Sequence, residues 1–405
     1  MKFKTSSKEL KSTLSVIKSS TSLSNSDKGG DISEDWNLLK IVAHSESGKV
    51  DFFSTNIGVW SGSTLDAEVE ESGEVFIDGP QFIKIIDTFD KESFLDFSAE
   101  KDKDKKETNL ICKTKNPKNN KWIQKTGFLT VTSVGPFDEN PPDEKREKIT
   151  VSADELIKAV NAVEFSSDTN IIRQYLWGVQ VEIFGKDDIA ACATDKIRIC
   201  WYDKKGADRD TEKAIIFIPI KSSFVSALKS INPKEDVDLE IGNKYTIIRQ
   251  NEKWHGVPNT VQTDTDKMPV WREIAKKLEQ DLKTFFKISK KELEDCVRSA
   301  LVSPCGKFGV KIGLSSKKKM IKLAIDSIED GGIIKTSVEA GGKLDDDKIS
   351  GEEIEGKFTL TIESLRDILS RCKSDEISIK IKDLNSPVII LDENEDFQYI
   401  SSVVV

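Results

Sequence analysis

Residues 3–10 read FKTSSKEL, a short apolar strand followed by a serine, a glutamate three residues after it, and a leucine. The same phrase returns as ITVSADEL at residues 149–156 and as FKISKKEL at residues 286–293. A serine three residues before a glutamate, ahead of an apolar run, is the capping box, in which the serine oxygen accepts from a backbone amide of the first helical turn. Each copy therefore predicts a strand that leads directly into a helix.

The three copies begin about 140 residues apart, which is the spacing of domains and not of solenoid repeats. Each copy is followed by a second strand and helix, at residues 75–89, 215–231 and 358–372. Stretches such as VDLEI and ISIKI then alternate apolar and polar residues, as half-buried strands do. The sequence predicts an α+β fold of three similar domains, each built of two helix-plus-antiparallel-sheet halves. The predicted domains are residues 1–148, 149–283 and 284–405.

The composition is that of a multidomain protein without a membrane-spanning segment. The 405 residues carry a net charge of −9, and no apolar run is long enough to cross a bilayer. The first residues, MKFK, are not followed by the apolar core of a signal peptide, so we expect a cytoplasmic protein. Six cysteines lie scattered without a CxxC pair, which favours buried reduced thiols over a metal site or disulfides.

Residues suited to catalysis are scarce. His44 falls in a predicted strand and His255 in a predicted turn, and the chain lacks GxGxxG, Walker A and GxSxG motifs. We therefore expect no enzyme activity, no cofactor and no metal site. One alternative is a nuclease in which Asp326, Glu329 and Asp330 bind magnesium, although solvated surface charge explains this cluster more simply.

Basic side chains recur on the predicted helices, away from the apolar face. In the first helix Leu10 and Leu14 share one face, while Lys11 and Lys18 share another. Lysines fill any solvated helix face, but recurrence in most of the helices favours a surface that meets the phosphate backbone of DNA without reading its sequence. The predicted DNA-facing residues of the helices are Lys11, Lys18, Lys84, Lys91, Lys158, Lys229, Lys291, Arg298, Arg366 and Lys373.

Several stretches resemble a known family in their order and spacing. Residues 365–391 read LRDILSRCKSDEISIKIKDLNSPVIIL, and the middle third contains FS at 165–166, RQYLWG at 173–178, ATDKIR at 193–198 and MPVWR at 268–272. These stretches are similar to segments of the bacterial DNA polymerase III beta subunit, the sliding clamp. The chain departs from that family where Lys196 and Ile197 replace a Gly-His pair, at Glu273 where an arginine is expected, and in its SSVVV ending.

The resemblance implies a DNA polymerase processivity factor. Two chains would close head to tail into a ring of six domains around duplex DNA, with the helices lining the hole. Such a homodimer would be placed on DNA by a clamp loader and would tether the replicative polymerase. The seam of the dimer is implied at Leu129, Val131, Leu301 and Val302.

The same resemblance implies two further sites. A loop carrying Arg173, Gln174 and Tyr175 resembles the family's DNA-contacting segment. Partner peptides would dock in an apolar cleft formed by Leu176, Thr194, Arg198, Ile199, Pro269, Ile274, Phe308, Pro387, Val403, Val404 and Val405. The alternative reading of the chain is a clamp-like scaffold that docks peptides but does not encircle DNA.

Overall fold

A computed structural model describes most of the chain. The described residues are 1–21, 38–56, 58–101, 108–115, 122–131, 137–142, 144–206, 210–281, 284–302, 310–315, 320–325, 338–343, 349–350, 355–383, 387–392 and 397–401. The chain divides into two compact units, each with its own sheets. The first unit is Met1–Asp154 with Pro219–Asn259, and the second is Glu155–Ile218 with Thr260–Val405.

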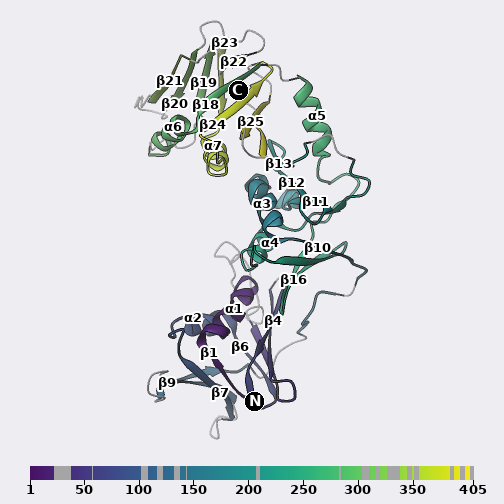
Figure 1. Ribbon diagram of the computed structural model, residues 1–405, viewed down its shortest axis with the longest axis vertical. Coiled ribbons are helices and arrows are strands. Elements are labelled where there is room, and N and C mark those ends of the chain that lie inside the picture. The colour runs from purple at the N-terminus through teal and green to yellow at the C-terminus, as the bar shows by residue number, and fades with distance from the viewer. Residues whose placement is uncertain are drawn as a thin grey trace. The chain divides into compact units, whose positions relative to one another are not determined.

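A strand, a helix and a set of antiparallel strands recur along the described chain, in six copies (Figure 1). The elements of the first unit are β1 (Lys2–Ser6), α1 (Ser7–Thr21), β2 (Leu38–His44), β3 (Lys49–Asn56), β4 (Val59–Asp66), β5 (Glu68–Glu71), β6 (Gly73–Asp78), α2 (Gly79–Asp87), β7 (Phe94–Lys101), β8 (Thr108–Lys115), β9 (Trp122–Leu129), β10 (Glu147–Ser152), α4 (Lys221–Leu228), β15 (Asp236–Ile241), β16 (Tyr245–Gln250) and β17 (Lys253–Pro258).

The second unit repeats the pattern and adds one helix, α5, between its copies. Its elements are α3 (Ala153–Val163), which starts in the first unit, the 3₁₀ turns η3 (Glu164–Ser166) and η4 (Ile171–Leu176), β11 (Gln180–Gly185), β12 (Asp188–Thr194), β13 (Arg198–Tyr202), β14 (Ile215–Phe217), α5 (Trp271–Asp281), β18 (Thr284–Ser289), α6 (Lys290–Val302), β19 (Val310–Ser315), β20 (Met320–Ile325), β21 (Val338–Lys343), β22 (Ile349–Ser350), β23 (Glu355–Leu360), α7 (Ile362–Leu369), β24 (Glu376–Ile381), β25 (Val388–Asp392) and β26 (Phe397–Ser401).

The serines of the recurring phrase stand at strand-to-helix junctions, as predicted. The hydroxyl oxygen of Ser6 accepts from the backbone amide of Glu9 at 3.2 Å, and that of Ser289 accepts from the amide of Glu292 at 3.4 Å. The middle copy also turns from β10 into α3, but the carboxylate of its glutamate, Glu155, is buried and accepts a hydrogen bond from a tyrosine of β13. The local chemistry of the phrase thus fixes where the helices begin, and the carboxylate of the middle copy has gained a role in the core.

The leading strand of each copy pairs with the sheet of the neighbouring copy. In the first unit β1 pairs antiparallel with β7, while β6 pairs with β2. In the second unit β18 pairs with β24, and β23 pairs with β19. The first unit therefore holds a five-stranded and an eight-stranded sheet, and the second a nine-stranded and a four-stranded sheet. Because the strands are exchanged, neither copy of a pair completes its sheet alone.

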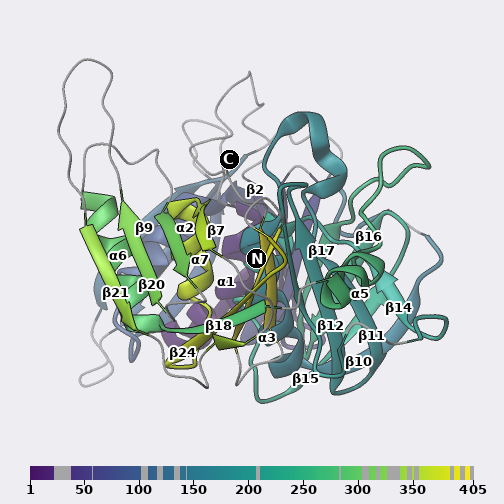
Figure 2. The same cartoon turned by 90° about the horizontal axis from the view of Figure 1, so that it is seen from above.

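The helices cover one face of these sheets. Leu10, Leu14 and Ile17 of α1 belong to one buried cluster with Phe82 of α2 and Phe97 of β7. Removing a side chain of this size from water stabilises the fold by roughly 1.5–3 kcal/mol. Helix α1 packs across β3 and β4 and beside α2, and in the second unit α6 and α7 lie side by side (Figures 1 and 2).

Helix α5 ends at Asp281, just before the predicted domain boundary between residues 283 and 284. Its first turn is held by a buried network: Trp271 Nε1 donates to Glu182 at 2.8 Å, and Arg272 pairs with Glu182 at 2.6 Å and with Asp203 at 2.8 Å. All four side chains are buried, and the guanidinium lies 4.2 Å from the centre of the Trp271 ring. The WR pair of the MPVWR stretch thus anchors α5 to the sheet that contains β11.

Two of the predicted helices end earlier than the sequence suggested. Helix α2 ends at Asp87 and α7 at Leu369, so Lys91 and Lys373 lie in the turns that follow and not on the helices. The turn after α2 is stabilised by the carboxylate of Asp90, which accepts from the next amide but one at 2.9 Å. The prediction that Lys91 and Lys373 stand on helices is therefore wrong.

The predicted turn at His255 is also wrong, because this residue lies buried in β17. Its strand pairs with β4, and this pairing joins the two parts of the eight-stranded sheet. Among the described helices none combines the length and the apolar character that a membrane span needs.

Candidate functional site

Two cations of α1 bind the neighbouring helix. The ammonium of Lys11 donates to the backbone carbonyls of Asp87, at 2.9 Å, and of Phe89, where α2 ends. The ammonium of Lys18 lies 2.6 Å from the Asp87 carboxylate. Cations are favourable beside the unpaired carbonyls at a helix C-terminus. The sequence predicted that these two lysines share a helix face. It did not predict their contacts with the end of α2, which depend on how α1 packs against α2.

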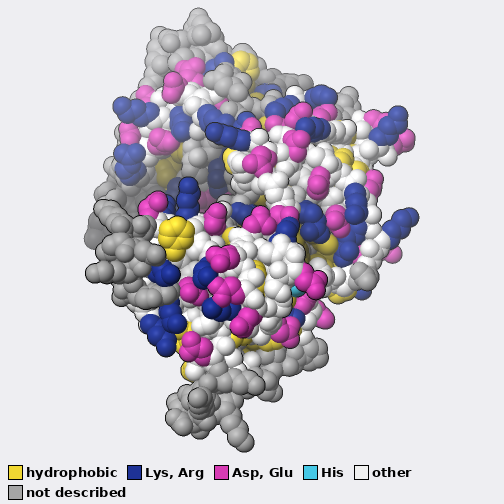
Figure 3. All heavy atoms as spheres, turned by 60° about the horizontal axis from the view of Figure 1, so that its bottom comes forward, with side chains coloured by type: hydrophobic (Ala, Val, Ile, Leu, Met, Phe, Trp, Pro, Cys, Tyr) yellow, Lys and Arg dark blue, Asp and Glu magenta, His cyan; other side chains and the backbone are white. Residues whose placement is uncertain are grey.

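Three other predicted DNA-facing lysines of the first unit are exposed. Lys84 stands on α2, Lys91 in the turn behind it, and Lys229 at the end of α4. Helix α1 packs against both α2 and α4, so these positions belong to one adjoining set of helices. Elsewhere on the surface lysine and arginine are interspersed with aspartate and glutamate, as Figure 3 shows for one face of the molecule.

The second unit brings two predicted cations together. Lys158 of α3 and Lys373 after α7 line the same open cavity, of about 300 Å³, together with Arg371. Lys291 and Arg298 are exposed on α6, where Arg298 lies 3.5 Å from Asp295. The guanidinium of Arg366 on α7 lies 3.1 Å from the adjacent Asp367. Ion pairs of this exposed kind contribute little to stability and leave the cations accessible to an anionic partner.

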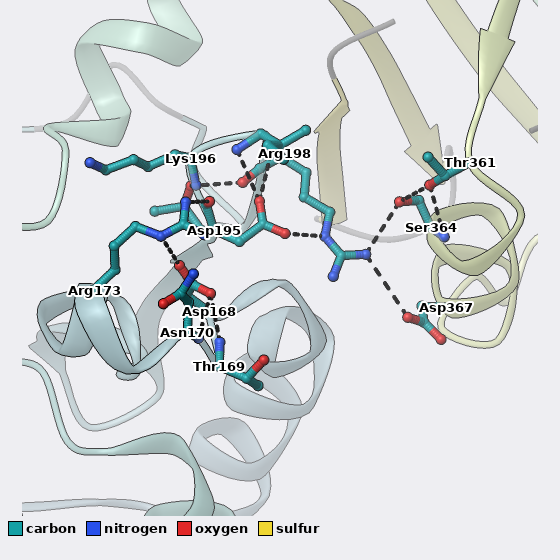
Figure 4. Close-up of polar contacts among 12 residues, drawn as sticks. Asp168, Thr169, Asn170, Arg173, Asp195, Lys196, Arg198, Thr361, Ser364 and Asp367 are labelled. Carbon is teal, nitrogen blue, oxygen red and sulfur yellow. Dashed lines mark hydrogen bonds and ion pairs between the residues drawn. The ribbon is translucent and has the colours of Figure 1, made fainter. Parts of the chain in front are cut away.

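Hydrogen bonds and an ion pair stabilise the turn that carries Arg173 (Figure 4). Asp168 accepts from the backbone amides of the next two residues at 2.7 and 2.8 Å, and its other oxygen lies 2.7 Å from Arg173 Nε. Arg173 also donates to the backbone carbonyl of Asp195 at 3.1 Å. Gln174 is exposed and Tyr175 half-buried, so this part of the predicted DNA loop faces solvent at only some of its positions.

The segment that includes Arg198 is a second tight turn, next to the first (Figure 4). One carboxylate oxygen of Asp195 accepts from the amides of Ile197 and Arg198, at 3.0 and 2.9 Å. The other lies 2.7 Å from Arg198 Nε. Lys196, between them, has a φ of 76°, in the left-handed region that favours glycine. This is the position at which the resembling family has glycine.

Arg198 also reaches helix α7. Its guanidinium donates to the hydroxyl of Ser364 at 3.2 Å and lies 4.0 Å from the carboxylate of Asp367 (Figure 4). Ser364 is itself held by Thr361, the N-cap of α7, whose side chain accepts from the Ser364 amide. The arginine therefore joins β13 to the start of α7.

The predicted cleft residues differ in their exposure. Leu176, Thr194 and Ile199 are buried, Arg198, Pro269 and Pro387 are half-buried, and Ile274 is 37% exposed. The three buried residues belong to the packing beneath any docking surface. Phe308, Val403, Val404 and Val405 lie outside the described residues, as do Asp326, Glu329 and Asp330 of the nuclease alternative.

Sequence reasoning missed four exposed apolar residues in or near the segments that carry the predicted cleft residues. Ile172 is 84% exposed, Ile197 62%, Val261 79% and Val270 58%. Each is a β-branched apolar residue, and Ile197 follows the polar pair Asp195 and Lys196, which is a signal that the sequence did offer. Exposed apolar side chains of this size mark candidate contact surfaces when they accompany a predicted site.

The predicted seam residues of the first unit lie at a sheet edge. Strand β9 is the outer strand of the five-stranded sheet, and Leu129 at its end is 70% exposed. Val131, just beyond, is 36% exposed. Leu301 and Val302 lie in the last turn of α6, where the structure describes the backbone alone. An exposed edge with apolar side chains is a ready site for pairing with another chain.

Within the described ranges no group of three histidine, cysteine or acidic side chains is arranged to hold a metal ion. The thiols of Cys112, Cys192, Cys200 and Cys372 are free and buried. Burial raises the pKa of Cys112 and of Cys372 to about 12, so these thiols stay protonated and unreactive at neutral pH.

Comparison with known proteins agrees with this geometry. Residues 150–255 match the family model described as the DNA polymerase III beta subunit, central domain. The DNA polymerase III subunit beta of Pseudomonas aeruginosa superposes with a TM-score of 0.78 at 14% identity, with 100% of both chains covered. The chain has the fold of a bacterial sliding clamp.

Other clamps of this family match equally well. The DNA polymerase III beta subunit of Thermotoga maritima has a TM-score of 0.78 at 16% identity, and the DNA polymerase sliding clamp of Bacillus subtilis has 0.78 at 17%. In both cases 100% of this chain and 99% of the other are covered. No curated protein sequence matches the chain. The resemblance read from the sequence is confirmed as a divergent one.

Proposed function

We propose that this protein is a DNA polymerase processivity factor, a homodimeric sliding clamp that encircles duplex DNA. The observation that carries the proposal is the beta subunit central domain at residues 150–255, inside a chain whose whole length has the clamp fold. A sliding clamp holds the polymerase on DNA and does not catalyse a reaction, so the protein would act as a non-catalytic accessory subunit in DNA replication.

The proposal divides the chain into three domains, residues 1–148, 149–283 and 284–405. The pairwise exchange of leading strands supports this division, because β1 exchanges with β6, β10 with β14, and β18 with β23. A second chain then completes the ring. Exposed Leu129 on the edge strand β9 supports a seam in the first domain, and β21 is the outer strand of the four-stranded sheet among the described strands of the third.

In this ring the exposed helix cations Lys84, Lys229 and Lys291 face the duplex. They attract phosphates through water and counterions without fixing a register, so the ring can slide. Lys11, Lys18 and Arg173 have partners within the protein. In this proposal they contribute to DNA binding mainly through the positive electrostatic potential of the surface. Because the ring is closed, a bound polymerase stays near the primer end, which raises its effective concentration there.

Polymerase and clamp loader dock, in this proposal, at the surface that carries Ile172, Ile197, Val270 and Ile274. Exposed apolar side chains suit the leucine and phenylalanine anchors of a short linear peptide. The Arg198 guanidinium, fixed by Asp195 and Ser364, is a polar group that can orient such a peptide.

Retention on DNA tests the proposal. The loaded protein should stay on nicked circular DNA through a high-salt wash and should run off the same DNA once it is made linear. Sedimentation should give the mass of a dimer at micromolar concentration. Equal retention on both DNA forms would reject encirclement. Peptide binding without retention on the circle would favour the non-encircling scaffold.

A further inference from the structure

The segment that joins β9 to β10 runs along the eight-stranded sheet of the first unit. We call its described residues, 137–142 and 144–146, the strap. None of these residues belongs to a helix or a strand. Their contacts fall, in chain order, on β6 and β2, on β17 beside β4, and on the turn between β15 and β16. The strap therefore touches both parts of the sheet that the β4–β17 pairing joins.

The strap is fixed at its first end by an aromatic contact and an ion pair. The ring of Phe137 meets that of Phe76 edge-on, with the centroids 5.5 Å apart. The carboxylate of Glu139 lies 2.7 Å from Lys40 Nζ, which also lies 3.0 Å from Glu74. The side chain of Lys40 is only 15% exposed, so this ion pair is more shielded from water than a surface pair.

Pro141 lies against the pairing itself. It is buried, and its ring fills the space beside Gly256 of β17, since a Cβ added to Gly256 would overlap it. Gly256 is the partner of Trp60 on β4. Trp60, in turn, packs in a buried cluster with Ile247 of β16 and Trp254 of β17. The glycine in this strand therefore lets the strap approach the place where the two parts of the sheet meet.

The far end of the strap is held by hydrogen bonds from the backbone. The carboxylate of Glu144 accepts from the amide of Lys244 at 3.1 Å and from that of Tyr245 at 3.0 Å. Gly242 leaves room for this carboxylate, because a Cβ there would overlap it. The ring of Tyr245 meets that of Trp60 edge-on, with the centroids 4.9 Å apart, so this anchor is connected to the pairing. Hydrogen bonds to a charged group are stronger than those between neutral groups.

The β4–β17 pairing needs such support because it is short. The two strands pair over residues 60–63 and 253–256, whereas β3 and β4 pair along the whole of both strands. Proteins open locally at such places at a lower free energy than that of global unfolding. An element that contacts both sides of the pairing opposes this opening.

We infer that the strap locks the β4–β17 pairing, and that its release lets the two parts of the eight-stranded sheet separate while the rest of the first unit stays folded. The strap is thus a conformational device within one chain. The inference goes beyond the proposed function, since it needs neither DNA nor a second copy of the chain.

Native-state hydrogen exchange of the full chain, read by mass spectrometry, tests the inference. Phe137→Ala/Glu144→Gln removes one contact at each end of the strap. Exchange in the peptides that cover β4 and β17 should rise at least tenfold, the size expected from losing hydrogen bonds to a charged group. Exchange in β7 and β8, which belong to the five-stranded sheet of the same unit, should not change. The matched control Asp138→Asn removes an exposed carboxylate of the strap and should exchange as the unmodified protein does.

A double-mutant cycle tests the middle of the strap. Gly256→Ala should raise exchange in β4 and β17, because the new methyl group displaces Pro141. Pro141→Ala removes the ring atom that this methyl group would meet. Gly256→Ala should therefore raise the exchange rate less in the Pro141→Ala protein than in the unmodified one.

Unchanged exchange in β4 and β17 of the Phe137→Ala/Glu144→Gln variant would overturn the inference, and so would an equal rise throughout the first unit, which is global unfolding. Independent effects of Gly256→Ala and Pro141→Ala would overturn it as well. The proposed clamp function fails separately, by equal retention on circular and linear DNA, a result that leaves exchange at this pairing unaffected.

Discussion

Lys18 on α1 forms an ion pair with Asp87, the last residue of α2, at 2.6 Å. Lys11, two helical turns earlier, donates to the backbone carbonyl of the same aspartate at 2.9 Å. These contacts separate two classes of helix cation that look alike in the sequence: those that join helices and those that point to solvent. Mutations of the two classes should therefore have different effects.

The solvent-facing class should control DNA binding. In Lys84→Gln/Lys229→Gln the slope of log affinity against log salt concentration should fall by about 2, because each phosphate contact contributes roughly one unit. Fluorescence anisotropy with duplexes of unrelated sequence measures this slope. Lys234→Gln/Lys244→Gln removes two exposed charges from loops of the same unit and serves as the control. An equal change in both variants would show that only net charge matters.

Lys196 should tolerate glycine better than any other substitution. Its φ of 76° costs a residue with a side chain roughly 1 kcal/mol. The greater freedom of glycine in the unfolded chain offsets part of this gain. We expect Lys196→Gly to raise the melting temperature slightly and Lys196→Val to lower it by several degrees. A lower melting temperature for Lys196→Gly than for Lys196→Val would contradict the strained backbone.

His255 should make the first unit sensitive to acid. The two ring nitrogens of His255 form hydrogen bonds with the hydroxyls of Ser61, at 2.9 Å, and Ser230, at 2.7 Å. Burial lowers the pKa of the ring to about 3, and the nearby charge of Lys253 acts in the same direction. Because the folded pKa lies below the unfolded value, near 6.5, the unfolded state binds a proton first as the pH falls. This contribution is complete above pH 6.5 and is lost progressively toward pH 3.

The loss at pH 4.5 should amount to roughly 2–3 kcal/mol from this group. Urea unfolding at a series of pH values measures it, and His255→Gln should flatten the profile between pH 4.5 and 6.5. A profile that keeps the same slope in the variant would assign the acid sensitivity to other groups.

Gly62 should not accept a side chain. A Cβ added here would lie 2.2 Å from Trp254 Nε1, across the pairing of β4 with β17. Gly62→Ala should therefore destabilise the protein by about 1–3 kcal/mol, as overpacking of a filled site does. Gly185→Ala is the control, since its nearest neighbour would be 3.8 Å away. Thermal unfolding of the two variants should differ clearly, and similar melting temperatures would place Trp254 elsewhere.

Leu129 should report on self-association. Because its side chain is 70% exposed at the end of an edge strand, Leu129→Glu should shift a dimer toward monomer by at least tenfold in dissociation constant, with little change in the stability of the chain. Sedimentation velocity measures the shift. Ile216→Glu, at a residue 46% exposed on β14, is the matched control. A dimer unaffected by Leu129→Glu, or a monomeric parent protein, would exclude this edge as the seam.

The helix starts and the apolar helix faces could be predicted from sequence. Ser6 and Ser289 start helices because a hydroxyl next to free amides is a short-range interaction. The apolar faces were equally readable, since Leu10 and Phe82 follow the helical period and are fully buried. Helix ends were less predictable, because Thr88 and Asp90 close α2 through contacts that compete with continued helix.

What depends on packing between elements could not be predicted. The engagement of Lys11 by α2, and the placement of Arg198 between Asp195 and Ser364, need residues brought together from distant segments. Burial of Leu176, Thr194 and Ile199 also depends on packing between elements. These three residues of the predicted cleft are therefore core residues and not surface residues.

The eight-stranded sheet has a consequence for synthesis of the chain. Strand β10 pairs with β15, and β4 pairs with β17. The first unit therefore includes residues up to Asn259, while the intervening segment 155–218 is part of the second unit. Ribosomes extend a chain by about 5–20 residues per second, and pairing over long sequence separations is slow. The edges of β4 and β10 therefore stay unpaired on the nascent chain for many seconds, until β15 and β17 have been synthesised. During this interval the exposed strand edges are prone to aggregation, and a chaperone that binds them would prevent it.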